Sequence, residues 1–131
     1  MKTRTINKEL YRNYLKKADE YFEAMNNEFS SQRFNSSVLN AIHCAISATD
    51  ALTVFFKGIR HAGERHEDVI GLLNTLEVDK DTLNNKTKQL LSLLDIKNAV
   101  EYEERLTTEQ GALTAIKNTE RFLSWTKSML P

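Results

Sequence analysis

Residues that interrupt helices are nearly absent from this chain of 131 residues. Its one proline is the last residue, and it has only four glycines. Proline breaks a helix because it lacks an amide donor and clashes with the preceding turn, and glycine weakens a helix by its conformational freedom. No run of valine, isoleucine or threonine alternates with polar residues as it would in a half-buried strand. The chain is therefore predicted to be all-α.

Length and charge indicate one domain, spanning residues 1–131, and exclude one class of function. Hydrophobic residues make up 40% of the chain and charged residues 27%, as in ordinary globular proteins. Lysine and arginine together number 18, and so do aspartate and glutamate, so the formal net charge is zero. A protein that coats nucleic acid non-specifically needs an excess of positive charge, so that role does not fit, whereas a local basic site does.

The expected location is the cytoplasm. The N-terminal residues contain no apolar segment for export, and no stretch approaches the roughly 18–20 apolar residues that span a bilayer. The single cysteine, Cys44, has no partner for an internal disulfide, which suits a reducing compartment. We therefore expect a cytoplasmic protein without a membrane partner.

Apolar periodicity divides the chain into four or five helices. Apolar residues recur at steps of three and four along each segment, which is typical of a helix with one buried face. Short connections between such helices are typical of an antiparallel up-and-down bundle. The expected helices cover residues 7–29, 35–57, 66–76, about 83 into 97–102, and 107–130.

Capping residues predict where several of these helices begin and end. Asn35 and the serine after it are good N-cap residues for the second helix, and Gly58 is a natural stop. Thr107 and Gln110 match a capping box, in which each side chain serves the other residue's free amide. Residues 59–65 are expected to form a loop.

The second helix has an unusual number of small side chains. Small residues allow two helices to approach closely. This helix is therefore expected either to be the central one or to pair across a dimer interface. The small residues are Ala41, Cys44, Ala45, Ser47, Ala48 and Ala51.

Side chains of four different chemistries gather where the fourth helix ends. Lys97, Asn98, Glu101 and Tyr102 supply an amine, an amide, a carboxylate and a phenol just after a leucine-rich run. On a helix, Asn98, Tyr102 and Arg105 share one face, whereas Lys97 and Glu101 share another and can form an i,i+4 ion pair. Lys97 and Tyr102 would point about 140° apart on an ideal helix. They could meet at one ligand only if the helix bends or a second subunit closes the site. Both a binding patch and a helix end satisfied by its own pairs fit this pattern.

Another polar stripe lies on the second helix. His43, Ser47 and Asp50 occur at i, i+4 and i+7, so they share one side of it. These are the residue types of a hydrolase triad, but one helix face places them in a row, and the glycine-rich turn of a nucleophile is missing. We interpret them as a stripe that is either hydrogen-bonded internally or lines a groove toward Lys97–Tyr102.

No metal or cofactor is expected. His61 and His66 lie near Glu64 and Glu67, but their spacing is not that of a recognised metal site. The interpretation is a solvated loop followed by a helix start.

In the order of its elements the chain resembles the HEPN superfamily, which comprises small helical proteins of toxin–antitoxin, defence and RNA-processing systems. The resemblance covers nearly the whole chain. It rests on the long first helix and on the segments 40–48, 66–69 with 72–73, and 119–125. It implies a HEPN-like bundle and, as in that superfamily, a homodimer whose groove is built from two copies of one motif.

The resemblance also concerns a catalytic motif. Catalytic members are metal-independent endoribonucleases whose motif is an arginine, a polar residue, three variable residues and a histidine. In this chain Lys97 stands at the arginine position, Asn98 at the polar position and Tyr102 at the histidine position. Histidine titrates near neutral pH and can shuttle a proton, whereas a phenol titrates near pH 10. Lysine keeps the charge but lacks the bidentate fork of arginine. The spacing is therefore retained without the two key groups.

Three functional hypotheses remain. The leading one is a non-catalytic or atypical HEPN protein that binds RNA, a nucleotide or a protein partner in a defence or toxin–antitoxin setting, such as a cognate antitoxin or a nucleotidyltransferase-like protein. The second is a metal-independent endoribonuclease in which Lys97 and Tyr102, together with His43, replace the usual pair. The third is a structural bundle that contacts proteins only. The candidate ligand-binding residues are His43, Ser47, Asp50, Lys97, Asn98, Glu101, Tyr102 and Arg105.

Overall fold

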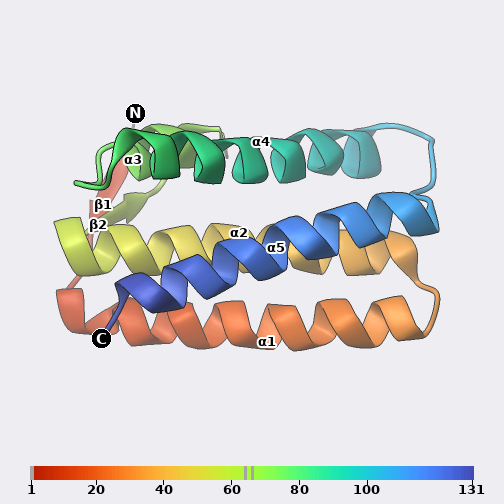
Figure 1. The fold of residues 1–131 in the computed structure, drawn as a ribbon, viewed down its shortest axis with the longest axis horizontal. Coiled ribbons are helices and arrows are strands. Elements are labelled where there is room, and N and C mark those ends of the chain that lie inside the picture. Colours follow the sequence, from red (N-terminus) through yellow and green to blue (C-terminus); the bar gives the residue numbers. More distant parts are fainter. Residues whose placement is uncertain (1, 64, 66) are drawn as a thin grey trace.

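The computed structural model describes residues 2–63, 65 and 67–131. In Figure 1 the four long helices lie side by side, and helices that follow each other along the chain run in opposite directions. The predicted all-α, antiparallel up-and-down bundle is confirmed. Within the described residues the helices are α1 (Tyr11–Ser30), α2 (Phe34–Lys57), α3 (Asp68–Leu73), α4 (Lys80–Tyr102) and α5 (Glu109–Met129), and a short 3-10 helix, η1 (Lys8–Leu10), precedes α1.

A small sheet closes one end of the bundle. Strand β1 (Thr3–Thr5) pairs with β2 (Ile59–His61) in antiparallel fashion, with Thr3 opposite His61 and Thr5 opposite Ile59. The prediction of a loop over 59–65 is therefore wrong for its first three residues. The two strands are far apart in sequence and only three residues long, so no local alternation could indicate them. The expected start of the third helix includes His66, which lies outside the described residues.

Helix α2 is the centre of the bundle. Its small residues Ala41, Cys44, Ala48 and Ala51 are fully buried within the single chain. In Figure 1, α2 and α5 lie between α1 and α4. The prediction of a central helix is confirmed, and the alternative, pairing across a dimer interface, is wrong for this stripe because these side chains contact helices of their own subunit.

The apolar character of α2 has a second consequence. Among the described helices it is the one whose length and mean hydropathy would also suit a membrane span. However, 78% of its most apolar window is buried inside the bundle. Its composition is thus accounted for by the core that it forms with α1 and α5.

Buried hydroxyl groups tie the helices together. The Ser37 hydroxyl donates to the Met25 carbonyl at 2.9 Å, which joins α2 to α1. The Thr119 hydroxyl donates to the Ala41 carbonyl at 3.4 Å, which joins α5 to α2. Because a buried hydroxyl must find an acceptor, these contacts also fix how the helices lie against each other.

Most helices begin or end a few residues away from the predicted bounds, and two of the predicted caps are not formed. Gly58 ends α2 in the left-handed conformation (φ 67°), as predicted. Helix α2 begins at Phe34, and Asn35 does not cap it. The N-cap of α5 is Thr108, whose hydroxyl accepts from the Gly111 amide at 3.0 Å. The predicted capping box of Thr107 and Gln110 is therefore wrong. The N-cap lies one residue later, and the residue three positions after Thr108 is Gly111, which has no side chain to complete a box.

Candidate functional site

The Lys97–Tyr102 patch lies on the last turns of α4, at the end of the bundle away from the small sheet (Figure 1). The patch is helical throughout, since α4 runs unbroken to Tyr102. Helix α4 therefore places Lys97 on its buried face and leaves Tyr102 78% exposed.

The amine of Lys97 is committed to an ion pair. Its Nζ donates to Glu101 Oε2 at 2.8 Å, across one turn of the helix. The amine also lies 6.0 Å from the centre of the Tyr102 ring. The long lysine side chain therefore brings its charge to the phenol although the two residues point in different directions. This contact needs neither a bent helix nor a second subunit.

His43 is the residue of α2 that the structure brings to this patch. Its ring lies 5.4 Å from that of Tyr21 on α1. Burial lowers the pKa of His43, and the charges of Glu101 and Lys97 act on it in opposite directions. Burial therefore favours the neutral form of the imidazole, which lies within electrostatic reach of the Lys97–Glu101 pair.

Ser47 and Asp50 continue the stripe along α2 away from the patch. Both are buried, with exposed fractions of 8% and 6%. Burial raises the pKa of Asp50 to about 7, and the cations that act against this rise are Arg60 and Lys17. The stripe is thus shared between two environments, with His43 beside Lys97 and Glu101 and with Asp50 beside residues of β2 and α1.

Asn98 lies on α4, whereas Arg105 lies beyond the end of this helix at Tyr102, so the prediction that Asn98, Tyr102 and Arg105 share one helix face is wrong for Arg105. Both are exposed. Arg105 Nε donates to Glu103 Oε2 at 2.9 Å, so its charge is balanced by a neighbouring carboxylate. Both cations of the patch therefore have a carboxylate partner within the chain, and its exposed uncharged side chains are Asn98, Tyr102 and Leu106, the last of which is 79% exposed.

The segment between α4 and α5 is held by Asn35, a residue that was predicted as an N-cap of α2. The Asn35 side chain accepts a hydrogen bond from the Thr107 amide at 2.8 Å. This bond joins the start of α2 to the segment between α4 and α5. No local sequence pattern could indicate it, because the two residues lie far apart along the chain.

A second set of polar residues, which was not predicted from the sequence, lies on the buried side of α4. Lys86 and Gln89 are both buried, and the Lys86 amine donates to Gln89 Oε1 at 3.2 Å. The sequence does indicate that Lys86 is buried. It lies three residues after Leu83 and four before Leu90, on the apolar face of the helix. Lysine at such a position indicates a buried cation.

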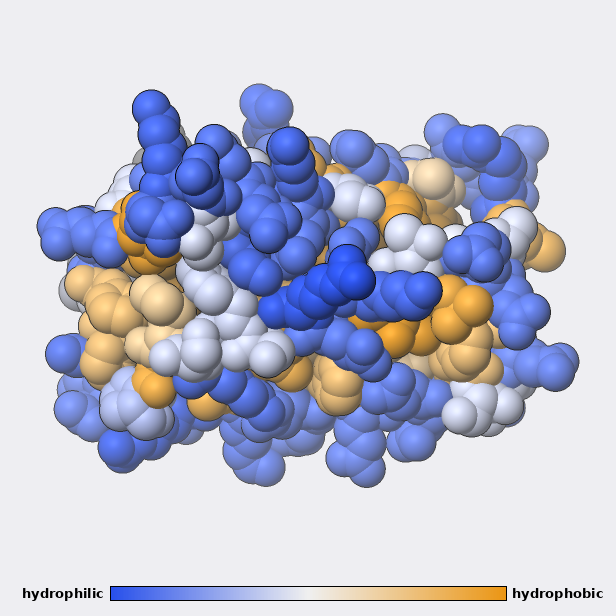
Figure 2. All heavy atoms as spheres, in the orientation of Figure 1, coloured by the Kyte–Doolittle hydropathy of each residue, from blue (hydrophilic) through white to orange (hydrophobic). Residues whose placement is uncertain are grey.

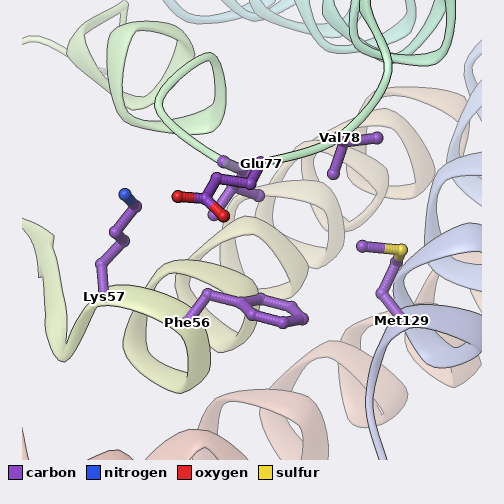
Figure 3. A pocket seen from close by; sticks show the side chains of 6 residues that line it. Phe56, Lys57, Glu77, Val78 and Met129 are labelled. Atoms are coloured by element: carbon purple, nitrogen blue, oxygen red, sulfur yellow. The ribbon is translucent and has the colours of Figure 1, made fainter.

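A cavity of about 250 Å³ with both apolar and charged lining residues lies at the opposite end of the bundle (Figure 3). In Figure 3, Phe56 and Met129 approach it from two sides, while Lys57 and Glu77 lie together at one edge. None of the sequence-predicted site residues lines it. The residues around it are Phe56, Lys57, Leu76, Glu77, Val78 and Met129.

The described part of the chain contains no group of three or more histidine, cysteine, aspartate or glutamate side chains placed to hold a metal ion. Glu64 and His66, considered above as part of such a group, lie outside the described residues. Cys44 is buried, and burial raises the pKa of its thiol to about 12, so the thiol stays protonated.

Comparison with known families defines the class of this bundle. Residues 11–129 match the model of the HEPN domain, which includes all four long helices. A search of curated proteins found no match. The chain belongs to the HEPN family, and the resemblance seen in the sequence is confirmed. Membership places the chain in a family that contains ribonucleases and nucleotide-binding modules.

Proposed function

We propose that this HEPN domain is a non-catalytic module that binds a partner protein through the exposed end of α4. The observation that carries the proposal is the exposure of Tyr102 and Leu106, at 78% and 79%, beside cations that already have carboxylate partners. Large exposed aromatic and aliphatic side chains are the anchors that protein interfaces bury. The partner that we propose first is a second copy of the chain.

The charges of the patch favour a protein over RNA at this place. A phosphate backbone is bound by cations that release their counter-ions. Lys97 would have to leave Glu101, and Arg105 would have to leave Glu103, before either could bind a phosphate. The amide of Asn98 and the phenol of Tyr102 can instead exchange hydrogen bonds with a protein surface. In a defence or toxin–antitoxin setting, a cognate antitoxin or a nucleotidyltransferase-like protein would use the same surface.

The oligomeric state of the purified chain tests this proposal. Light scattering on a sizing column should give a dimer for the wild type, and Tyr102→Asp and Leu106→Asp should shift it toward the monomer. Leu10→Asp is the matched control, since Leu10 is also an exposed apolar residue, at 43%, but lies in η1. A wild type that remains monomeric at high concentration, or a dimer that both variants leave intact, would contradict the proposed homodimer.

A metal-independent endoribonuclease is the second candidate, and the position of His43 favours it. A neutral imidazole within electrostatic reach of Lys97 can accept a proton, as the first step of RNA cleavage requires. Cleavage of single-stranded RNA in the presence of EDTA, abolished by Lys97→Ala, Tyr102→Phe or His43→Ala, would establish this activity. Intact RNA after incubation with the wild type would exclude the endoribonuclease activity and favour the proposed binding module.

A further inference from the structure

A hollow of about 450 Å³ lies on the surface where α4 meets α5, apart from the Lys97–Tyr102 patch. In Figure 2 strongly hydrophilic side chains gather over the middle of this face. None of the candidate residues of the patch lines the hollow. It is lined by Lys86 from α4 and by Glu120, Arg121, Ser124, Trp125 and Ser128 from α5.

Lys86 is a buried cation without a carboxylate partner. The residue is only 9% exposed. Its amine donates to Gln89 Oε1 at 3.2 Å and to the Arg121 carbonyl at 3.4 Å, both of which are neutral acceptors. No carboxylate in residues 2–63, 65 and 67–131 lies within ion-pair distance of it. An ammonium group has three donors, so one remains for a ligand, and a buried charge without a counter-ion is unfavourable.

A second cation stands beside this amine. Arg121 is exposed and forms no ion pair within the described part of the chain. Burial lowers the pKa of Lys86, and the charge of Arg121 lowers it further. Glu120 opposes this positive charge at the border, where it also faces the neighbouring hollow beside Phe22 and Lys127. Two cations against one carboxylate leave the hollow positive.

We infer that this hollow binds the phosphate group of a phosphate ester, held between Lys86 and Arg121. A phosphate carries up to two negative charges and three acceptor oxygens, which match one ammonium, one guanidinium fork and a hydroxyl. Ser124 lines the hollow and supplies that hydroxyl. Trp125 forms the wall, with its ring centre 5.7 Å from the Lys86 amine. The phosphate can belong to a small ester or to the backbone of RNA.

The only tryptophan of the chain, Trp125, reports on this site directly. Its fluorescence should change in a saturable way when the full chain is titrated with ribose phosphate, and should not change with ribose. Short single-stranded RNA is the second arm of the experiment. Tighter, salt-sensitive binding of RNA would identify a backbone phosphate as the source, whereas binding of ribose phosphate alone would identify a small ester.

Substitution of the buried cation completes the experiment. Lys86→Met should weaken binding about tenfold or more, because a charge-assisted hydrogen bond is lost while the apolar stem is kept. Lys127→Met is the matched control, since Lys127 is an α5 cation already paired with Asp19 at 2.6 Å. Lys97→Ala should leave the titration with ribose phosphate unchanged, which separates this site from the function proposed for the patch. No saturable response to either ligand, or equal affinity in Lys86→Met, would overturn the inference.

Discussion

The amine of Lys97 and the carboxylate of Glu101 meet at 2.8 Å on a part of α4 where the lysine is almost fully enclosed. The pair explains how a lysine can occupy a buried position at the end of a bundle. Its charge is balanced one turn away by a residue that remains partly exposed to water. Lys97 therefore contributes to the packing of α4 and to the charge around His43. Because its amine is paired with Glu101, it is not a free cation that could bind a phosphate directly.

Substitution of Glu101 should lower the free energy of unfolding more than substitution of Lys97. Glu101→Gln leaves the buried ammonium without its negative partner and should lower the free energy of unfolding by about 1–3 kcal/mol. Lys97→Met keeps the apolar stem and removes the buried charge, so its stability should stay within about 1 kcal/mol of the wild type. Urea unfolding at neutral pH measures both. If Lys97→Met proves the more damaging change, the pair does not have the role described here.

The positions of the helices could be predicted from the sequence because each carries its own apolar period. In α5, for example, Ala112, Ile116, Thr119 and Phe122 recur at steps of three and four, and all four are buried. Gly58 was predicted as the end of α2 from another local feature, the preference of glycine for the left-handed conformation after a helix. Such features depend on residues within one or two turns, which a single sequence displays.

Features that depend on distant residues could not be predicted. The pairing of β1 with β2 and the bond from Thr107 to Asn35 each join segments far apart along the chain. The candidate site was predictable in part, since Lys97 and Glu101 form the expected i,i+4 pair. Its separation from Asp50 was not, because that depends on which helices face each side of α2.

The buried carboxyl of Asp50 should make stability depend on pH. Burial raises its pKa to about 7 in the folded chain, against an ordinary value of 3.8. The fold thus favours the protonated form. The resulting stability is fully present below about pH 4 and is lost as the pH rises through about 7.

Asp50→Asn should remove this dependence, because the amide is neutral at every pH. The variant should exceed the wild type in free energy of unfolding by roughly 2–4 kcal/mol at about pH 8, and by less at about pH 5. Asp79→Asn is the control. Hydrogen bonds from Thr82 lower the pKa of Asp79, so its contribution is lost as the pH falls, and its removal should leave the decline toward alkaline pH intact. Parallel wild-type and Asp50→Asn curves would show that Asp50 is not the group that titrates.

The N-cap of α5 offers a test between two adjacent threonines. Thr108→Ala removes the hydroxyl that accepts from the Gly111 amide and should destabilise the chain by about 1 kcal/mol. Thr107→Ala should cost much less, because the hydrogen bond of Thr107 to Asn35 comes from its backbone amide. Thermal unfolding of the two variants compares them directly. Equal losses would mean that the cap is not confined to Thr108.

The bond between Asn35 and Thr107 should control the order of the segment next to the Lys97–Tyr102 patch. Asn35→Ala removes the acceptor of the hydrogen bond from the Thr107 amide. Because this amide then has no hydrogen-bond partner within the protein, it should exchange with solvent much faster than in the wild type. Asn35→Asp keeps an oxygen at the same position and should preserve the protection. Hydrogen exchange followed by NMR resolves this single amide. Because residues 103–106 connect it to Tyr102, loosening the segment should also weaken the dimer proposed above, whereas Asn35→Asp should leave it intact. Protection of Thr107 that survives in Asn35→Ala would show that another contact holds the end of α4 in place.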